Sequence, residues 1–133
     1  MGPLVDTSVL VDLYRGVASP PVAALRRLLF EGTPPATTAI VVQEVLQGAR
    51  DERDLDRLAR QLSAFEPLPA ASYALHAEAA DIYRRARRAG ITSSTVDALL
   101  VAYAAANRRA LLTSDALLRR VAAVAGVELA DAR

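Results

Sequence analysis

The feature that most constrains the fold is an alternation of short apolar runs with longer amphipathic segments. Leu4-Val5 is such a run and ends at a charged residue, and 110–113 is another. Between such runs, the segment 72–89 places apolar side chains three to four residues apart, as one face of a helix requires. Short buried strands that alternate with helices predict a mostly parallel sheet with helices on both faces. We therefore expect an α/β fold with three layers in the order α/β/α.

The same reading places the boundaries of the elements. We expect strands over 4–5, 36–37, 65–68, 110–113 and 127–129. We expect helices over 9–14, 20–31, 40–46, 51–64, 72–89, 95–107 and 115–126. Polar residues at the starts serve as caps, with Ser8 before the first helix and Ser94 or Thr95 before the sixth. Prolines 67 and 69 predict that the strand 65–68 lies at an edge of the sheet, since proline cannot donate a ladder hydrogen bond.

Composition narrows the class of protein. The chain has 133 residues, of which 53% are hydrophobic and 23% charged, which indicates one globular domain over 1–133. With no cysteine and a single histidine, His76, a disulfide, a thiolate zinc site, a cysteine nucleophile and a multi-histidine zinc site are all excluded. Any metal site in this chain has to rely on carboxylates.

Localisation follows from the absence of targeting signals. The uncharged run 98–106 is among the longest, and it is far short of the ~20 apolar residues that a membrane helix needs. The N-terminus lacks a basic region and reaches Asp6 at once, which argues against a signal peptide. We expect a soluble, cytoplasmic protein with no membrane partner. Its net charge of only +1 means that a polyanion would have to be held by local patches.

Four carboxylates stand near the points where strands lead into helices, and each has apolar neighbours. They are Asp6, Glu44, Asp97 and Asp115. An isolated desolvated charge is costly, and no arginine lies within three residues of any of the four. Because hard divalent cations prefer oxygen ligands, we interpret these residues, called here the acidic quartet, as a metal pocket.

The quartet should converge because sites in open parallel sheets form outside the carboxyl ends of the strands. Asp6 ends the first strand and Asp115 follows the strand 110–113, while Asp97 lies in the first turn of its helix, where the helix dipole favours an anion. Plainer interpretations stay open for single members. Asp115 could be only an N-cap, and Asp6 could form only an Asx turn.

At this point the chain resembles the PIN domain, and most closely the VapC-like ribonuclease toxins of bacterial toxin–antitoxin pairs. The motifs that carry the resemblance are Asp-Thr-Ser-Val-Leu-Val-Asp-Leu at 6–13, Glu44 with Leu46 and Gly48, Gly90-Ile91 followed by 97–102, and Leu-Thr-Ser-Asp at 112–115. They occur in order over essentially the whole chain. The resemblance implies a PIN-like fold for 1–133.

The resemblance also implies an activity. It predicts an endoribonuclease that depends on Mg²⁺ or Mn²⁺, in which Asp6, Asp97 and Asp115 hold the ion and Glu44 completes the site or orients water. Thr7 or Ser8, and Thr113, match hydroxyl positions that support the quartet. Many relatives carry another acid or polar residue and then an aromatic at the positions of Leu117 and Leu118, so the number of metal ions stays open.

Partners follow from the same resemblance. It implies an RNA substrate, a symmetric homodimer and a small antitoxin protein whose C-terminal segment occupies a groove near the acidic site. The helices at 20–31 and 51–64 offer leucine-rich stripes for such contacts. Four arginines are candidates for RNA phosphates: Arg15, Arg84, Arg85 and Arg88. The alternative for the last three is compensation of a helix dipole, with Asp81 pairing with Arg85.

Two other functions are weighed against the nuclease. One is a catalytically weak PIN-like module that binds RNA or helps an assembly to form. The other is a phospho-acceptor receiver domain, which also gathers aspartates at strand ends but wants a lysine, and this chain has none. The intact acidic quartet favours the nuclease.

Overall fold

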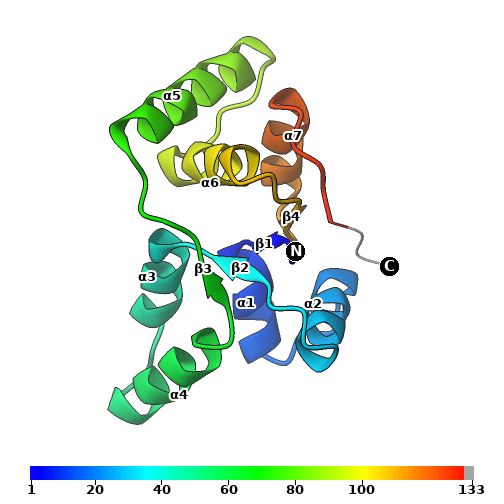
Figure 1. Cartoon of the computed structure of the whole chain (residues 1–133), viewed down its shortest axis with the longest axis vertical. Helices are drawn as coiled ribbons and strands as arrows, with labels where there is room; N and C mark the ends of the chain where they lie inside the picture. Colours follow the sequence, from blue (N-terminus) through cyan, green and yellow to red (C-terminus); the bar gives the residue numbers. More distant parts are fainter. Residues whose placement is uncertain (131–133) are drawn as a thin grey trace.

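The computed structural model describes residues 1–130, and its short strands lie between two layers of helices (Figure 1). The strands are β1 (Leu4–Val5), β2 (Ala36–Thr37), β3 (Glu66–Pro67) and β4 (Leu111–Leu112). The helices are α1 (Thr7–Tyr14), α2 (Pro20–Phe30), α3 (Ala39–Gln47), α4 (Glu52–Leu62), α5 (Tyr73–Arg88), α6 (Thr95–Ala106) and α7 (Ala116–Val124). The predicted three-layer α/β/α fold is confirmed.

The four strands form one parallel sheet in the order β3-β2-β1-β4. Leu4 pairs with Ala36 on one side and with Leu111 on the other, so β1 is central. The residues of β1 and β4 are at most 1% exposed, as expected for strands covered on both faces. β3 lies at one edge, as its prolines predict.

The helices divide between the two faces of the sheet. Figure 1 shows α1 to α4 on one side of the strands and α5 to α7 on the other. Within these layers α5 packs along α6, and α1 packs against both α2 and α3. Because all strands are parallel, their carboxyl ends meet at one edge of the sheet, and the chain enters α1 and α3 directly there.

Three local predictions are wrong. Ser8 does not cap α1, because the helix already begins at Thr7 and Asp6 takes the N-cap position. The predicted strand 127–129 shrinks to a single bridge between Leu129 and Leu111, since the Val127 amide is used to close the end of α7 on the Ala122 carbonyl. In α4, the alternating charges of 51–64 predict that its acids face outward, but Asp54 is buried.

Other boundaries are as predicted. Ser94 caps α6 by accepting a hydrogen bond of 3.0 Å from the Asp97 amide, and Asp51 caps α4 by accepting one of 2.8 Å from the Asp54 amide. Within residues 1–130, no helix is both long enough and apolar enough to cross a membrane.

Candidate active site

Asp6 occupies the centre of the site, directly after the buried strand β1. It is only 7% exposed, and its Oδ2 atom accepts two hydrogen bonds, one of 2.6 Å from Ser8 Oγ and one of 2.8 Å from Thr113 Oγ1. A buried carboxylate needs such donors to offset the loss of hydration. These two hydroxyls therefore fix one oxygen of Asp6 and leave Oδ1 outside the network.

The same hydroxyls tie the loop after β4 to the start of α1. The Ser114 amide donates to Ser8 Oγ at 3.1 Å, and the Asp115 amide donates to Thr113 Oγ1 at 3.0 Å. The loop that carries Asp115 is thus anchored through Thr113 and Ser8 to the residue after β1. The ends of two adjacent strands become one hydrogen-bonded unit.

Glu44 reaches this unit from α3. It is half-buried, and its Oε1 atom accepts a hydrogen bond of 2.9 Å from Thr7 Oγ1. Thr7 is the chain neighbour of Asp6, so a single hydroxyl links the side chain of Glu44 to the carboxyl end of β1. The structure therefore places both Thr7 and Ser8 in the network, where the sequence motif offered either one.

Asp97 stands in the first turn of α6 and is half-buried. Burial raises the pKa of Asp97 above its usual 3.8, hydrogen bonding with Ser94 opposes the rise, and the negative charges of Asp115 and Asp6 add to it. Like charges act in this way only over short distances. Asp115 and Asp6 therefore contribute to the electrostatic surroundings of Asp97, while burial is the larger cause of the raised pKa.

Asp115 is the N-cap of α7. Its Oδ1 atom accepts hydrogen bonds of 2.8 Å from the Leu117 amide and 3.3 Å from the Leu118 amide. The N-cap interpretation is therefore confirmed, and it does not compete with a role in the site because Oδ2 lies outside these bonds. Leu118 is fully buried in the core, and Leu117 packs partly against it.

Within residues 1–130, no member of the acidic quartet forms an ion pair, although Arg119 Nη2 donates to the Thr113 carbonyl at 3.0 Å beside the site. The ion pairs within residues 1–130 involve Asp54, Asp81 and Glu66, and none reaches a quartet residue. Over the same residues, no three His, Asp or Glu side chains already stand in an arrangement that ligates one ion. The donor set nevertheless fits a hard divalent cation in its chemistry, because it consists of carboxylate and hydroxyl oxygens, the ligands that such ions prefer.

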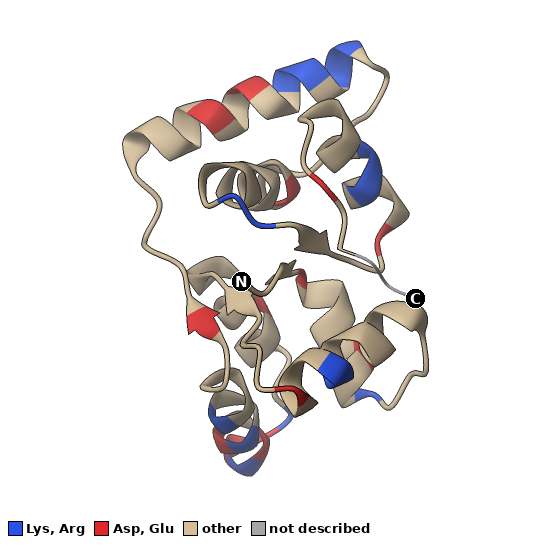
Figure 2. Cartoon of the chain, turned by 45° about the vertical axis from the view of Figure 1, so that its right-hand side comes forward, with Lys and Arg blue, Asp and Glu red and all other residues tan. Residues whose placement is uncertain are grey.

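The candidate RNA contacts fall in two separate places. The basic residues of α5 gather over its C-terminal half, at one end of the molecule (Figure 2). There Arg85 pairs with Asp81 at 3.0 Å, as the alternative to an RNA contact predicts. Arg84 lines a hollow of about 310 Å³ that also includes Thr95 of α6. Arg15 lies elsewhere, in the wall of a hollow of about 520 Å³ that Glu44 also lines.

Sequence reasoning missed three residues of that second hollow. Arg50, Asp54 and Arg57 line it together with Arg15 and Glu44. The spacing of Arg50, Asp54 and Arg57, with charges of opposite sign four and three residues apart, is a visible signal. On a helix, however, such spacing is equally typical of an exposed face.

The chain is similar to known proteins over most of its length. The family model described as the PIN domain matches residues 4–124. The chain is 31% identical over 132 residues to "VapC ribonuclease Mb1587" of Mycobacterium bovis and, to the same extent, to "Ribonuclease VapC11" of Mycobacterium tuberculosis, in each case over 98% of both chains.

Solved structures share the fold at lower identity. VapBC2 from Rickettsia felis, solved with a DNA fragment from its promoter, superposes with a TM-score of 0.78 at 18% identity and 98% coverage of both chains. FitAcB from Neisseria gonorrhoeae gives a TM-score of 0.70 at 21% identity, covering 97% of this chain and 96% of that one. With a family match over most of its length and near-complete relatives of this kind, the chain belongs to the PIN-domain family, among its VapC-like members.

Proposed function

We propose that this protein is a metal-dependent endoribonuclease and the toxin of a toxin–antitoxin pair. The observation that carries the proposal is the hydrogen-bonded unit that Ser8 and Thr113 build around Asp6 and the Asp115 loop, with Glu44 joined to it through Thr7. The near-complete relatives bear the name ribonuclease, which supports RNA as the substrate.

Each residue of the site has a role in this proposal. Asp6, Asp97 and Asp115 would hold a Mg²⁺ or Mn²⁺ ion. When bound, such an ion acidifies water and neutralises the charge that builds on a scissile phosphate. Ser8 and Thr113 donate hydrogen bonds to Oδ2 of Asp6, so Oδ1 is the oxygen left to bind the ion. Thr7 holds Glu44 through Oε1, so Oε2 is the oxygen left to orient the attacking water.

Cleavage of RNA by the purified protein tests this proposal. We expect cleavage with Mg²⁺ or Mn²⁺ and none in EDTA. Asp6→Asn should lower the rate by about a hundredfold or more, since removing even the partner of a ligand costs about 10- to 100-fold. Asp12→Asn, which changes an aspartate of α1 outside the quartet, is the matched control. Undiminished cleavage in EDTA contradicts the metal mechanism, and binding of RNA without any cleavage favours the catalytically weak module.

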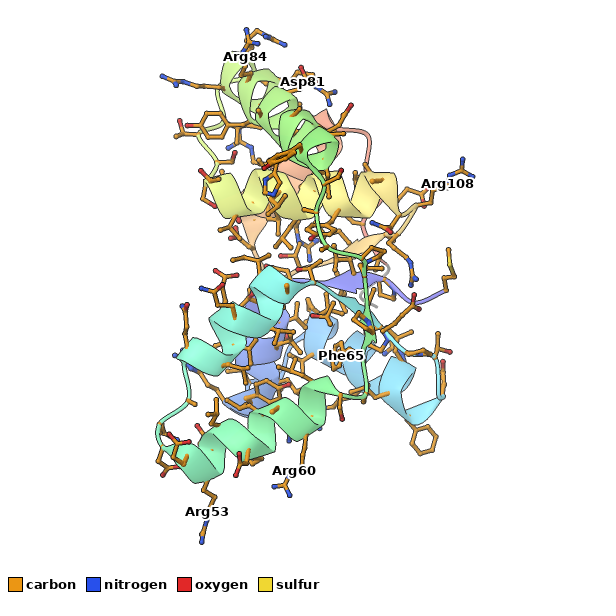
Figure 3. The ribbon with its side chains drawn as sticks, turned by 60° about the vertical axis from the view of Figure 1, so that its left-hand side comes forward. Arg53, Arg60, Phe65, Asp81, Arg84 and Arg108 are labelled. Atoms are coloured by element: carbon orange, nitrogen blue, oxygen red, sulfur yellow. The ribbon has the colours of Figure 1, made fainter. Side chains whose placement is uncertain are left out.

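We place the antitoxin in the groove between α1, α2 and α4. This groove measures about 730 Å³ and is lined by the apolar side chains Leu13, Leu29, Phe30 and Phe65 together with Arg26, Arg57 and Arg60. Phe30 is 93% exposed, which is unusual for a large apolar side chain and fits a surface that another chain covers. Figure 3 shows Phe65 lying between α4 and the body of the molecule. Structural neighbours include toxin–antitoxin complexes, such as one from Klebsiella pneumoniae with a TM-score of 0.67.

Co-expression tests this placement. The protein should be tolerated in cells only together with a short DNA-binding protein encoded beside it, and the two should co-purify. Phe30→Ser should weaken that complex, whereas Tyr73→Ser, which removes an equally exposed aromatic from α5, should not. Harmless expression of the active enzyme alone would identify a housekeeping nuclease instead.

We also propose that the protein forms a homodimer. Exposed apolar side chains remain outside the groove, including Tyr73 at 97% exposure, and a domain of this size gains from covering them. Light scattering of the isolated protein decides the matter. A monomer at ~100 μM, far above the Kd of a specific interface, refutes the dimer.

A further inference from the structure

A basic pocket opens beside the acidic site on the side of Glu44. It lies between α1, α3 and α4, has a volume of about 520 Å³, and is lined by Arg15, Arg50 and Arg57 as well as Glu44 and Asp54. Glu44 belongs to the acidic quartet through its bond to Thr7, so this pocket adjoins the site where a phosphodiester would be cut. Three guanidinium groups next to a proposed nuclease centre require a chemical explanation.

Ion pairing with Asp54 accounts for only part of the three arginines in this pocket. Its side chain is 8% exposed and takes Arg57 Nη2 at 2.7 Å and the Arg50 backbone amide at 3.0 Å, which satisfies it with one guanidinium and one N–H. These bonds hold its pKa at about 2, so Asp54 is ionised at neutral pH. Arg50 makes only a marginal contact of 3.5 Å with Asp54, and its side chain is 82% exposed.

Arg15 is less constrained still. It is exposed and takes part in no ion pair within residues 1–130, because the pairs over this range involve other arginines. The pocket therefore contains Arg57 held at 2.7 Å by the buried Asp54, Arg50 in a longer contact of 3.5 Å with the same carboxylate, and Arg15 outside the ion pairs of residues 1–130. A guanidinium binds phosphate oxygens in a bidentate manner, and this geometry suits a polyanion better than a single small ligand.

We propose that this pocket binds the backbone of single-stranded RNA, with Arg15 and Arg50 each holding one phosphate next to the scissile bond. Arg57 is a positioning residue in this arrangement, since Asp54 fixes it in the wall. The inference deepens the proposed function by giving the substrate strand a path from the pocket to Glu44. This path is distinct from the hollow that Arg84 lines with Thr95, because the two hollows share no lining residue.

The test compares two double variants that remove the same net charge. Arg15→Gln with Arg50→Gln removes the two more exposed guanidinium groups of the pocket, together with the 3.5 Å Arg50–Asp54 contact, and leaves the Arg57–Asp54 pair intact. Arg53→Gln with Arg108→Gln is the control, because both of these side chains point away from the body of the protein (Figure 3). Binding of a short fluorescein-labelled oligo(U) to the full chain is followed by fluorescence polarisation in EDTA over a series of salt concentrations.

We expect the pocket variant to lose affinity by about tenfold and its salt dependence to fall by about 1.4 in log–log slope, since each single-strand phosphate contributes ~0.7. The control variant should change the slope far less. An unchanged slope in the pocket variant, an equal loss in the control, or wild-type protein that does not bind oligo(U) at low salt overturns the inference.

This experiment does not depend on the nuclease activity. Binding that requires Arg15 and Arg50 in a protein that never cuts RNA refutes the nuclease and leaves the pocket. Metal-dependent cleavage by a variant with unchanged oligo(U) binding refutes the pocket and leaves the nuclease.

Discussion

Thr113 Oγ1 donates a hydrogen bond of 2.8 Å to Asp6 Oδ2 and so joins the ends of β4 and β1 across 107 residues of chain. Thr113 is 2% exposed and Asp6 7%, so this contact is shielded from water. Its hydroxyl also accepts a hydrogen bond from the Asp115 amide, so Thr113 connects Asp6 and Asp115 through one side chain.

The first prediction concerns this hydroxyl. Thr113→Val keeps the shape of the side chain but leaves Asp6 with one donor fewer, and it should lower the free energy of unfolding by about 1.5 kcal/mol. Metal-dependent cleavage should fall by about 10- to 100-fold, as for other residues that orient a ligand. Urea denaturation and cleavage rates measure the two effects. Thr113→Ser restores the donor and should recover most of both, and a serine variant as impaired as valine would rule this explanation out.

The second prediction follows from the raised pKa of Asp97. A carboxyl whose pKa in the folded state exceeds the unfolded value costs stability once the pH is high enough to ionise it. Asp97→Asn should therefore stabilise the protein at neutral pH in EDTA, and the gain should vanish below a pH of about 3.8, where the wild-type carboxyl is protonated in both states.

Thermal unfolding in EDTA over a pH series checks this result, with Asp12→Asn as a control that should stay within about ±0.5 kcal/mol of wild type. Adding Mg²⁺ should stabilise the wild type more than Asp97→Asn, because an ion that binds only the folded state adds stability by mass action. Destabilisation by Asp97→Asn at neutral pH would contradict the raised pKa of Asp97.

The third prediction has the opposite sign and concerns Asp54. Its pKa is lowered from 3.8 to about 2, first by the Arg50 backbone amide and then by the Arg57 side chain. The stabilisation is present above the unfolded value of 3.8 and is lost as the pH falls through about 2. Asp54→Asn should destabilise the protein at neutral pH, and its difference from wild type should shrink in acid. Asp56→Asn, on the exposed face of α4, should leave the pH profile unchanged, and a constant difference for Asp54→Asn at all pH values would refute the prediction.

The fourth prediction uses two glycines that differ in their surroundings. A Cβ atom at Gly2 would lie 2.3 Å from the Pro34 carbonyl oxygen, and the Gly2 carbonyl is itself held by Arg109 Nη1 at 2.8 Å. Gly2→Ala should therefore cost about 1–3 kcal/mol in urea denaturation, as overpacking typically does. At Gly48, with φ of −83°, an added Cβ comes no closer than 3.4 Å to the Val45 carbonyl oxygen. Gly48→Ala should then raise the free energy of unfolding by about 0.4–1 kcal/mol, because alanine lowers the conformational entropy of the unfolded chain. Equal effects at both positions would show that the close approach at Gly2 does not limit stability.

Much of the fold could be predicted because its signals are local. The apolar run of β1, the proline-marked edge strand and the Ser94 cap each depend on residues within one turn or one strand. Parallel strands then bring their carboxyl ends to one edge, which is why Asp6, Asp97 and Asp115 could be expected to meet. The failed strand 127–129 shows the limit, because only the tertiary structure reveals that the Val127 amide is already used by the end of α7.

The sequence by itself determined the acidic quartet, the hydroxyls beside it and the order of strands and helices, since residue type and spacing carry that information. The tertiary structure alone decided that Thr113 bonds to Asp6, that Thr7 bonds to Glu44, and that Arg15 shares a pocket with Arg57. The physical reason is that a hydrogen bond or a shared pocket between distant segments depends on how whole helices pack against the sheet. No local pattern distinguishes the buried Asp54 from an exposed acid with the same neighbours, because only packing removes its water.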